Sequence, residues 1–371
     1  MPMIDKKLLA PLFLLIISTQ SFAQSFYAQG SDLLMGVGAK NIATAGAKSA
    51  NTNDVYAMFY NPAGLAEIHS GEFVISTQAD AQLGLVNFIG LAYSFALESL
   101  DLKMTMALTF MPRLYIESSG AYHEDDFESI FLRYTLPGLS PNFDGEINSK
   151  TDDYRFGMAI TPLHSPTWSL GISVGYVNCA TTFAGVALED PSNFTYMSTV
   201  ATATAFGLGA KYYLNEDVTF GLNLRNIDSK LTVKVHTTDD NGESHETYDV
   251  NFPYDFSAGV SWQYNQSVNL AADYQQVFGT YGNYNLDFKL LRFGTSINHN
   301  TLDYHLGLIV PIVIGSDNIE DIKIPPAMPT LGLGWHNNIV DLSLAFYIHP
   351  IMTLNLGRPS PSLDLSLSYE F

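Results

Sequence analysis

One segment of this chain matches a catalytic pattern: Gly171-Ile172-Ser173-Val174-Gly175 has the glycine and serine spacing of a hydrolase nucleophile elbow. That chemistry needs a sharp strand-to-helix turn that exposes the serine. Here the pattern lies inside the alternating run from Trp168 to Val177, and no helical pattern follows it. Gly171, Ser173 and Gly175 would share one face of a strand and leave room for a neighbouring segment. The sequence therefore predicts no catalytic residue and no enzyme.

Patterns for metals, cofactors and nucleic acids are also absent from the sequence. The nine histidines show no zinc spacing. The acidic run from Asp239 to Glu243 lacks the twelve-residue spacing of a calcium loop, and its Asn241-Gly242 pair is typical of a hairpin tip. A formal net charge of −20 argues against nucleic-acid binding. We therefore expect no metal, no cofactor and no nucleic-acid partner.

The first residues have the order of a secretory signal peptide. Lys6 and Lys7 precede the apolar run 8–17, and Ser21-Phe22-Ala23 supplies small residues before a cleavage site. The apolar run is too short to cross a bilayer as a helix. Residues 1–23 are therefore predicted to be a signal peptide, and the single cysteine, Cys179, excludes an internal disulfide in the exported chain.

Composition indicates how the exported chain meets a membrane. Apolar residues make up 47% and charged residues only 15%, yet no apolar run long enough for a transmembrane helix follows Ala23. A closed β-barrel is the other way to satisfy every backbone group in lipid. The chain ends on a strand-like alternation with a terminal aromatic residue, similar to the terminal strand of outer-membrane barrels (Leu363, Leu365, Leu367, Tyr369, Phe371).

Period-two segments predict about fourteen strands within residues 72–371, and hence an all-β, transmembrane antiparallel barrel. The segments 218–237 and 246–264 are each predicted to be one continuous strand. Short connections alternate with longer ones, of which 117–152 and 178–199 are the longest. Outer-membrane barrels have short periplasmic turns and long outer loops, so this alternation places the chain in the outer membrane of a Gram-negative bacterium.

Residues 24–71 precede the barrel and do not resemble a strand pair. They are rich in glycine and alanine and contain the segment 60–66, in which Asn61-Pro62-Ala63-Gly64 has turn chemistry. We predict that this segment folds into the lumen as a hatch. It resembles the N-terminal hatch of the FadL-type outer-membrane transporters for long-chain fatty acids and aromatic hydrocarbons. The spacing from Gly36 to Asn61 is also similar to that of the related PorV-like barrels of a secretion system.

The FadL resemblance implies a monomer that captures hydrophobic molecules at its outer surface and releases them sideways through a kink in the third strand. Pro112-Arg113 interrupts the predicted third strand, 102–116, and is the candidate kink; the alternative is that Pro112 starts the outer loop. Seven apolar residues of the loop 117–152 are candidates for the outer hydrophobic groove, and the first four have helical spacing (Phe127, Ile130, Phe131, Tyr134, Leu136, Leu139, Phe143). A loop helix that only packs on the barrel rim is the alternative.

Two functions remain open at this point. The first is outer-membrane transport of a hydrophobic small molecule, such as a long-chain fatty acid, with no covalent step. The second is a PorV-like role, in which the barrel binds other proteins during secretion. In both, the expected partners are outer-membrane lipids, lipopolysaccharide and, during biogenesis, the barrel-assembly machinery.

Overall fold

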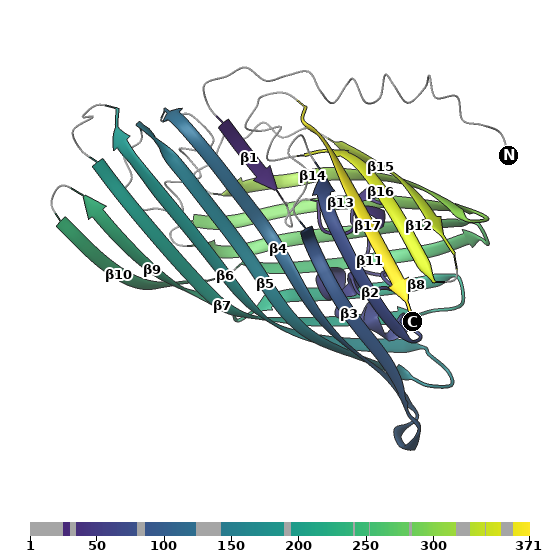
Figure 1. Cartoon of the computed structure of the whole chain (residues 1–371). Coiled ribbons are helices and arrows are strands. Elements are labelled where there is room, and N and C mark those ends of the chain that lie inside the picture. The colour runs from purple at the N-terminus through teal and green to yellow at the C-terminus, as the bar shows by residue number, and fades with distance from the viewer. Residues whose placement is uncertain are drawn as a thin grey trace, which may run out of the picture.

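The computed structural model describes residues 25–29, 35–79, 86–123, 142–188, 194–239, 242–251, 253–281, 284–316, 327–337, 339–349 and 359–371. Strands dominate this part of the chain, and they form one sheet that curls into a barrel around a few short helices (Figure 1). The predicted signal peptide, 1–23, lies outside the described residues and stays a prediction.

The sheet has seventeen strands. They are β1 (Ser25–Gln29), β2 (Gly71–Ala79), β3 (Val86–Leu97), β4 (Leu102–Tyr122), β5 (Phe143–Pro162), β6 (Trp168–Ala187), β7 (Phe194–Tyr213), β8 (Val218–Ile227), β9 (Lys230–Asp239), β10 (Gly242–Asn251), β11 (Tyr254–Asn265), β12 (Val268–Tyr281), β13 (Tyr284–His299), β14 (Leu302–Ser316), β15 (Met328–His336), β16 (Val340–Ile348) and β17 (Pro361–Glu370). The helices are α2 (Ala39–Ala43), α3 (Ala57–Tyr60), η1 (Pro62–Glu67) and η2 (Glu98–Leu100).

The wall is a closed antiparallel barrel of fourteen strands, as the sequence predicts. Around the ring, each of the fourteen positions in the wall pairs with the next one, and β17 pairs with β2 to close the ring. β8 and β9 share one position in the wall, because both pair with β7, and β10 and β11 share the next position. β1 is an additional strand on the edge of β4.

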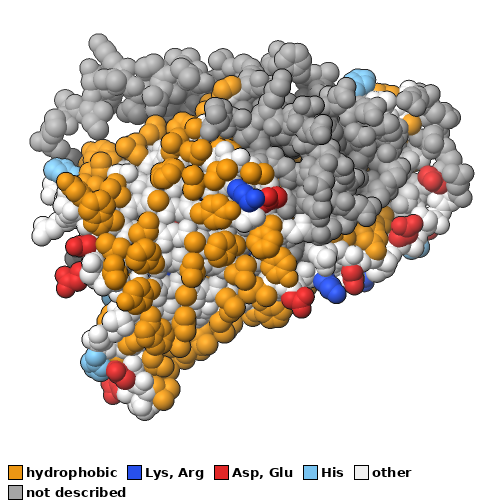
Figure 2. All heavy atoms as spheres, turned by 180° about the vertical axis from the view of Figure 1, so that it is seen from behind, with side chains coloured by type: hydrophobic (Ala, Val, Ile, Leu, Met, Phe, Trp, Pro, Cys, Tyr) orange, Lys and Arg blue, Asp and Glu red, His pale blue; other side chains and the backbone are white. Residues whose placement is uncertain are grey.

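The strands bury alternate residues, because successive side chains of a strand point to opposite faces. On β6 the exposed residues Leu170, Ile172, Val174 and Tyr176 alternate with buried ones. Similar apolar side chains are exposed on most strands, and on the face in Figure 2 they spread over the wall. Apolar exposure on this scale suits contact with lipid, which agrees with the outer-membrane location predicted from the sequence. None of the helices in the described residues is long and apolar enough to cross a membrane.

Residues 35–68, here called the hatch, lie inside the barrel. The helix α2 packs against β14 to β17, and η1 packs against β4 to β7 on the other side of the lumen. Most hatch side chains are buried, including those of the predicted residues Asn61, Pro62, Ala63 and Gly64. A segment in contact with both halves of the wall has the position of a plug.

Two predicted features of the wall are wrong in detail. The segments 218–237 and 246–264 are each interrupted. In the first, the break between β8 and β9 coincides with positive φ angles of 59° at Asn226 and 46° at Asp228. Much of the predicted loops 117–152 and 178–199 is strand, because β4 to β7 continue their pairing well beyond the predicted ends. The wall is therefore much taller on the β4 to β7 side than the alternation of apolar residues suggests.

Candidate functional site

The hatch is held in shape by buried hydrogen bonds of two side chains. The Tyr60 hydroxyl accepts a bond from the Val37 amide and donates one to the Val37 carbonyl, both at 2.9 Å. The Asn61 Oδ1 accepts a 3.1 Å bond from the Ala63 amide and so caps η1. The first residue of η1, Pro62, has no backbone N–H group and therefore needs no acceptor at this position. The Asn-Pro-Ala segment is therefore a helix start in the lumen.

Glycines in the wall make room for this helix start. A Cβ atom on Gly171 would collide with the backbone of Pro62 and Ala63, and one on Gly209 would collide with Asn61. Gly171 is the first glycine of the hydrolase-like pattern, and its inward face is where the hatch lies. The pattern thus has the close-packing role that the sequence predicts for its small residues.

The opposite side of the hatch is fixed by polar bonds to the wall. On this side, backbone groups of the hatch pair with the following wall side chains: Ala39 amide to Ser366 at 2.5 Å, Thr330 to Ala43 carbonyl at 2.9 Å, Arg292 to Ala45 carbonyl at 2.7 Å, Ser49 amide to Asp273 at 2.7 Å, and Val55 amide to Glu72 at 3.0 Å. These bonds reach β17, β15, β13, β12 and β2. Directional bonds on several strands define one docked position of the hatch.

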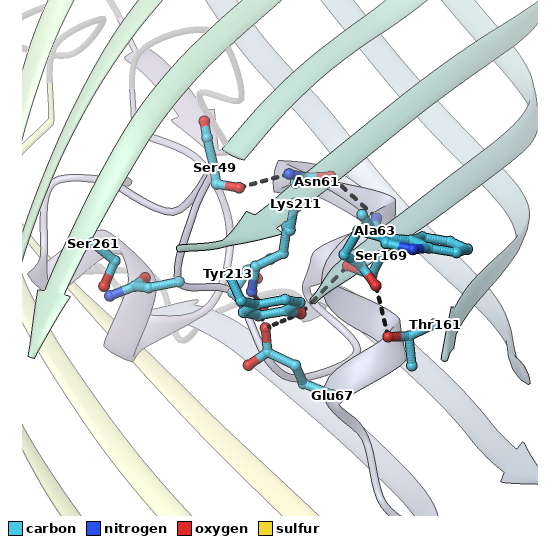
Figure 3. A network of polar contacts seen from close by, with 12 residues as sticks. Ser49, Asn61, Ala63, Glu67, Thr161, Ser169, Lys211, Tyr213 and Ser261 are labelled. Atoms are coloured by element: carbon cyan, nitrogen blue, oxygen red, sulfur yellow. Dashed lines mark hydrogen bonds and ion pairs between the residues drawn. The ribbon is translucent and has the colours of Figure 1, made fainter. Parts of the chain in front are cut away.

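The end of the hatch is bound by a second polar network (Figure 3). The Lys211 ammonium contacts the Glu67 carboxylate and donates a 3.0 Å bond to the Thr52 carbonyl. The Tyr213 hydroxyl donates to the same Glu67 carboxylate at 2.9 Å and lies 3.3 Å from the Ser169 hydroxyl. Glu67 is the last residue of η1, so these contacts fix the point where the hatch turns towards the first barrel strands.

A girdle of buried charges lies between the hatch and β8 to β13. Arg225 pairs with Asp255, Gln275 donates to Asp255 at 3.0 and 3.1 Å, and Arg292 donates to the Gln275 oxygen at 2.9 and 2.6 Å. The Arg225 guanidinium also lies 4.1 Å from the centre of the Phe59 ring. The cavity beside these groups has a volume of about 20 Å³, enough for about one water molecule. The girdle therefore fills the space between the hatch and this part of the wall with paired polar groups.

Two ionisable groups of the hatch have shifted pKa values. Burial lowers the pKa of Lys48 from 10.5 to about 8, with repulsion from Lys40 as the next cause. Burial raises the pKa of Asp54, against the attraction of Lys40 and Lys48. The docked hatch thus disfavours the charged form of both side chains.

Farther out, the inner face of the wall carries many apolar side chains, with polar pairs such as Ser149 and Thr181 among them. On β7 the face that carries Lys211 and Gly209 against the hatch continues outward with Ala205, Ala203 and Ala201. These alanines belong to a buried cluster on β5, β6, β7, β9 and β10, here called the outer-lumen cluster (Phe143, Ile147, Val177, Phe183, Met197, Ala201, Ala203, Ala205, Leu231, Val233, Val235, Val250). The rings of Phe143 and Phe183 pack edge to face with centroids 5.1 Å apart. A water-filled porin would have a polar lining here.

The wall is irregular on β4, the strand next to β5, at the predicted kink. β4 has a bulge at Arg113, because Pro112 pairs with Asp152 while Leu114 pairs with the adjacent Thr151. The bulge reverses the faces of the strand: Thr109 and Met111 are buried before it, and Ile116 and Ser118 are buried after it. β4 continues to Tyr122, so Pro112 does not start the outer loop, and the alternative interpretation of this residue is wrong.

Among the described residues, the other edge of β4 has a break in strand pairing at the same place. In the described wall, β3 pairs with β4 from Leu97–Leu102 up to Ile89–Phe110 and no farther. Beyond the bulge, β1 takes over this edge and pairs with Tyr115 to Ser119, while β5 occupies the opposite edge throughout. The stretch 111–114, here called the lateral gap, thus has no described strand partner on its β3 side.

The side chains that flank the lateral gap pack in the same buried cluster as apolar residues of the hatch. Phe88 of β3 and Met111 of β4 are buried in one cluster with Tyr56 and Phe59 of the hatch. The Tyr56 and Phe88 rings lie with centroids 4.6 Å apart. Sequence reasoning missed both β1 and this arrangement, because a five-residue strand paired only with one edge leaves no periodic signal.

The predicted groove residues are only partly described. Phe127, Ile130, Phe131, Tyr134, Leu136 and Leu139 lie outside the described residues, and so does the predicted loop helix. Phe143 is the first residue of β5 and belongs to the outer-lumen cluster. The other members of the cluster were not predicted, because small and branched residues on one strand face are equally typical of an ordinary core.

Comparison with known proteins was made by sequence and by structure. No protein-family model and no curated protein sequence matches the chain. Among solved structures, the toluene transporter TbuX of Ralstonia pickettii has a TM-score of 0.59 at 14% identity, over 92% of this chain and 100% of that chain. The toluene transporter TodX of P. putida has a TM-score of 0.56 at 15% identity, over 91% and 99%.

A FadL homologue of Pseudomonas aeruginosa has a TM-score of 0.57 at 12% identity, over 90% of this chain and 97% of that chain. The fold is that of the FadL-type channels. The resemblance first found in the hatch residues is therefore confirmed at the level of the fold. In this chain a lumenal hatch, an outer-lumen cluster and a bulged β4 occur in one molecule, and those three features define the candidate site.

Proposed function

We propose that this barrel carries hydrophobic small molecules, such as long-chain fatty acids or aromatic hydrocarbons, across the outer membrane without a covalent step. The observation that carries the proposal is the outer-lumen cluster, which lies outward of the polar girdle and begins on β5, the strand that pairs with β4 and its lateral gap. The names of the similar structures, toluene transporters and a FadL homologue, support the same class of ligand.

The energetics favour capture in the outer lumen. Burial of apolar surface contributes about 0.8 kcal/mol for each methylene group, so an acyl chain or an aromatic ring gains by leaving water for this lining. The girdle has the opposite effect, because Arg225, Asp255 and Arg292 would have to give up buried partners for an apolar ligand to pass between them. A ligand held above the girdle is therefore directed to the side of the barrel.

The lateral gap supplies a side route. Its flanking residues, Phe88 and Met111, are apolar; Phe88 packs on the hatch residue Tyr56, and Met111 belongs to the same buried cluster. A small shift of the hatch at this point would open an apolar path between β3 and β4 into the bilayer. In this proposal β1 forms the outer border of the path, and its five residue pairs with β4 limit how far the gap extends.

Removal of the bulge tests the side route. Deletion of Arg113 leaves Pro112 and Leu114 adjacent opposite Asp152 and Thr151, which restores a regular ladder with every other residue pair unchanged. We expect the deletion variant to assemble normally, with unchanged heat-modifiable migration, and to lose most uptake of a radiolabelled fatty acid or toluene. The matched control is Pro112→Ala, which keeps the extra residue and should keep uptake.

Full uptake by the Arg113 deletion variant would contradict the side route. Absence of uptake in the wild-type barrel, expressed in cells that lack other FadL-type channels, would contradict transport altogether. In that case co-purification of secreted proteins with the barrel would favour the PorV-like role.

A further inference from the structure

The outer hairpin of β9 and β10 carries a group of side chains that the transport proposal does not use. His236 on β9 lies directly opposite His245 on β10 in the strand register. Their rings stack with centroids 4.4 Å apart and planes 12° apart. Glu243 lies two residues before His245 on the same strand and therefore on the same face of the hairpin.

This face points away from the outer-lumen cluster. Leu231, Val233 and Val235 are buried on the inner face of β9, and His236 alternates with them. His236 also pairs with Ser198 of β7, a strand whose neighbouring residue on that face, Val200, is exposed. The group is therefore on the outside of the wall, where the side chains of His236 and Glu243 are 37% and 67% exposed.

The donor atoms are close enough to share one ion. The Nε2 atom of His236 lies 3.9 Å from a carboxylate oxygen of Glu243, and one donor atom from each of the three residues lies within 4.8 Å of the others. Zinc–nitrogen and zinc–oxygen bonds are about 2.0–2.2 Å long, so the ligand atoms of a tetrahedral site lie roughly 3.3–3.5 Å apart. Small rotations of exposed side chains would bring these atoms together.

One polar atom of the group also lacks a hydrogen-bond partner in the described part of the chain. The Nε2 atom of His236 is buried and has no hydrogen bond among the described residues. Stacking of two imidazoles accounts for the ring contact but leaves this nitrogen without a partner. A metal ion would satisfy it and would also balance the nearby carboxylate.

We propose that His236, Glu243 and His245 bind one divalent transition-metal ion of the zinc class on the outer hairpin. Imidazole nitrogens suit zinc and copper, whereas calcium and magnesium prefer all-oxygen sites. Three protein ligands leave the remaining coordination position to water. Bound metal joins β9 to β10 near their tip and so fixes the strand that supplies Val233 and Val235 to the outer-lumen cluster.

The direct test is calorimetric titration of the detergent-solubilised barrel with zinc chloride, after treatment with a chelator and without a polyhistidine tag. We expect one zinc ion per chain in the wild type. The variants His236→Asn and His245→Asn should bind at least about tenfold more weakly, since loss of a ligand costs no less than loss of a supporting contact. The matched control is His299→Asn, which removes an exposed imidazole at the other end of the barrel and should bind like the wild type.

A second measurement identifies the ligands. Copper(II) bound to the wild type should give an electron paramagnetic resonance spectrum with coupling to two imidazole nitrogens, and the His245→Asn variant should show one. Glu243→Gln keeps both imidazoles and nearly the same volume, so weaker zinc binding in this variant would assign the carboxylate independently of folding. Equal zinc affinity in the wild type and His236→Asn, or no zinc binding at millimolar concentration, would overturn the proposal.

Discussion

The inner and outer halves of the lumen share strands but differ in the chemistry of their side chains. On β7, Lys211 and Gly209 contact the hatch, whereas Ala205, Ala203 and Ala201 of the same face line the outer lumen. The inner half holds its contents by directional hydrogen bonds and ion pairs. The outer half offers apolar surface with no preferred orientation.

This difference separates two tasks within one barrel. A hatch must return to a single position, and hydrogen bonds at fixed distances from several strands specify that position. A channel for varied hydrophobic molecules gains from a lining that accepts many shapes. The comparison therefore assigns closure to the inner half and ligand capture to the outer half, and each assignment can be tested by itself.

The largest effect should come from removing the hatch. Deletion of residues 24–70 leaves β2 to β17 and the closing pairs between β17 and β2 intact. We expect an assembled barrel with large, steady conductance in planar bilayers, because a lumen of fourteen strands is wide enough for water. The intact protein should be nearly silent. Equal conductance of both proteins would show that the hatch in the inner half does not close the lumen.

A pH change should act on the inner half through Lys48. Its pKa is about 8 in the docked hatch and 10.5 when exposed, so the undocked state binds more protons between these values. Docking is therefore weakest below pH 8, where the charge costs at most about 3 kcal/mol, and strengthens as the pH rises towards 10. Lys40, Lys211, Asp54 and Asp273 also act on this ammonium group.

The measurement is protection of hatch amides from hydrogen exchange at pH 6.5 and 9.5, corrected for the intrinsic exchange rate. Lys48→Met should raise protection at pH 6.5 and abolish most of its pH dependence. Lys40→Met is the comparison variant: because burial is the first cause of the lowered Lys48 pKa and repulsion from Lys40 only the second, this variant should weaken the pH dependence without abolishing it. Unchanged pH dependence in Lys48→Met would show that another group is responsible.

A charge placed in the outer-lumen cluster should reduce uptake without changing closure to ions. Ala203→Asp places a carboxylate in the outer-lumen cluster, where an unpaired polar group costs about 1–3 kcal/mol. We expect roughly tenfold weaker uptake of a hydrophobic probe with unchanged closure to ions in planar bilayers. Thr204→Asp, on the opposite face of the same strand, is the matched control. Increased ion conductance in Ala203→Asp would show that the two halves are not independent.

Much of the wall could be predicted from the sequence, because lipid outside and a packed lumen inside impose alternation on each strand. The run Trp168 to Val177 is an example, with its exposed and buried residues in the predicted order. The prediction stopped short where the wall rises above the lipid. Along β4 and β5 from Glu117 to Asp152, polar residues occupy both faces, so strand pairing continues with no apolar period to reveal it.

The site was less predictable, for two physical reasons. Asn61 and Pro62 could be located because a helix start imposes a local residue pattern. The outer-lumen cluster, the end of β3 pairing at Ile89 and the contact between His236 and His245 depend on strand register, which joins residues far apart in sequence or across a hairpin. Residue spacing alone predicted no metal site for the same reason.

The smallest effect should come from the helix start in the hatch. In Asn61→Ala with Pro62→Ala, the cap of η1 is lost, and the carbonyls of Ser49 and Ala210 lose donors at 2.6 and 3.1 Å. Loss of a cap and its neighbouring bonds costs about 1–2 kcal/mol, less than the gain from all other anchors of the hatch. The barrel ladders do not include these residues, so the wall should keep its stability.

We therefore expect the double variant to migrate normally in heat-modifiable gels, to take up a hydrophobic probe more slowly, and to show brief openings in planar bilayers. The matched control is Asn51→Ala, which removes one hatch-to-wall bond, 2.8 Å long to Asn269, without touching the helix start. If both variants flicker equally, any lost anchor loosens the hatch, and the Asn-Pro segment has no special part in closure. If only the double variant flickers, the helix start is the element that keeps the inner half closed, because Asn61 both caps η1 and bonds to the Ala210 carbonyl of β7.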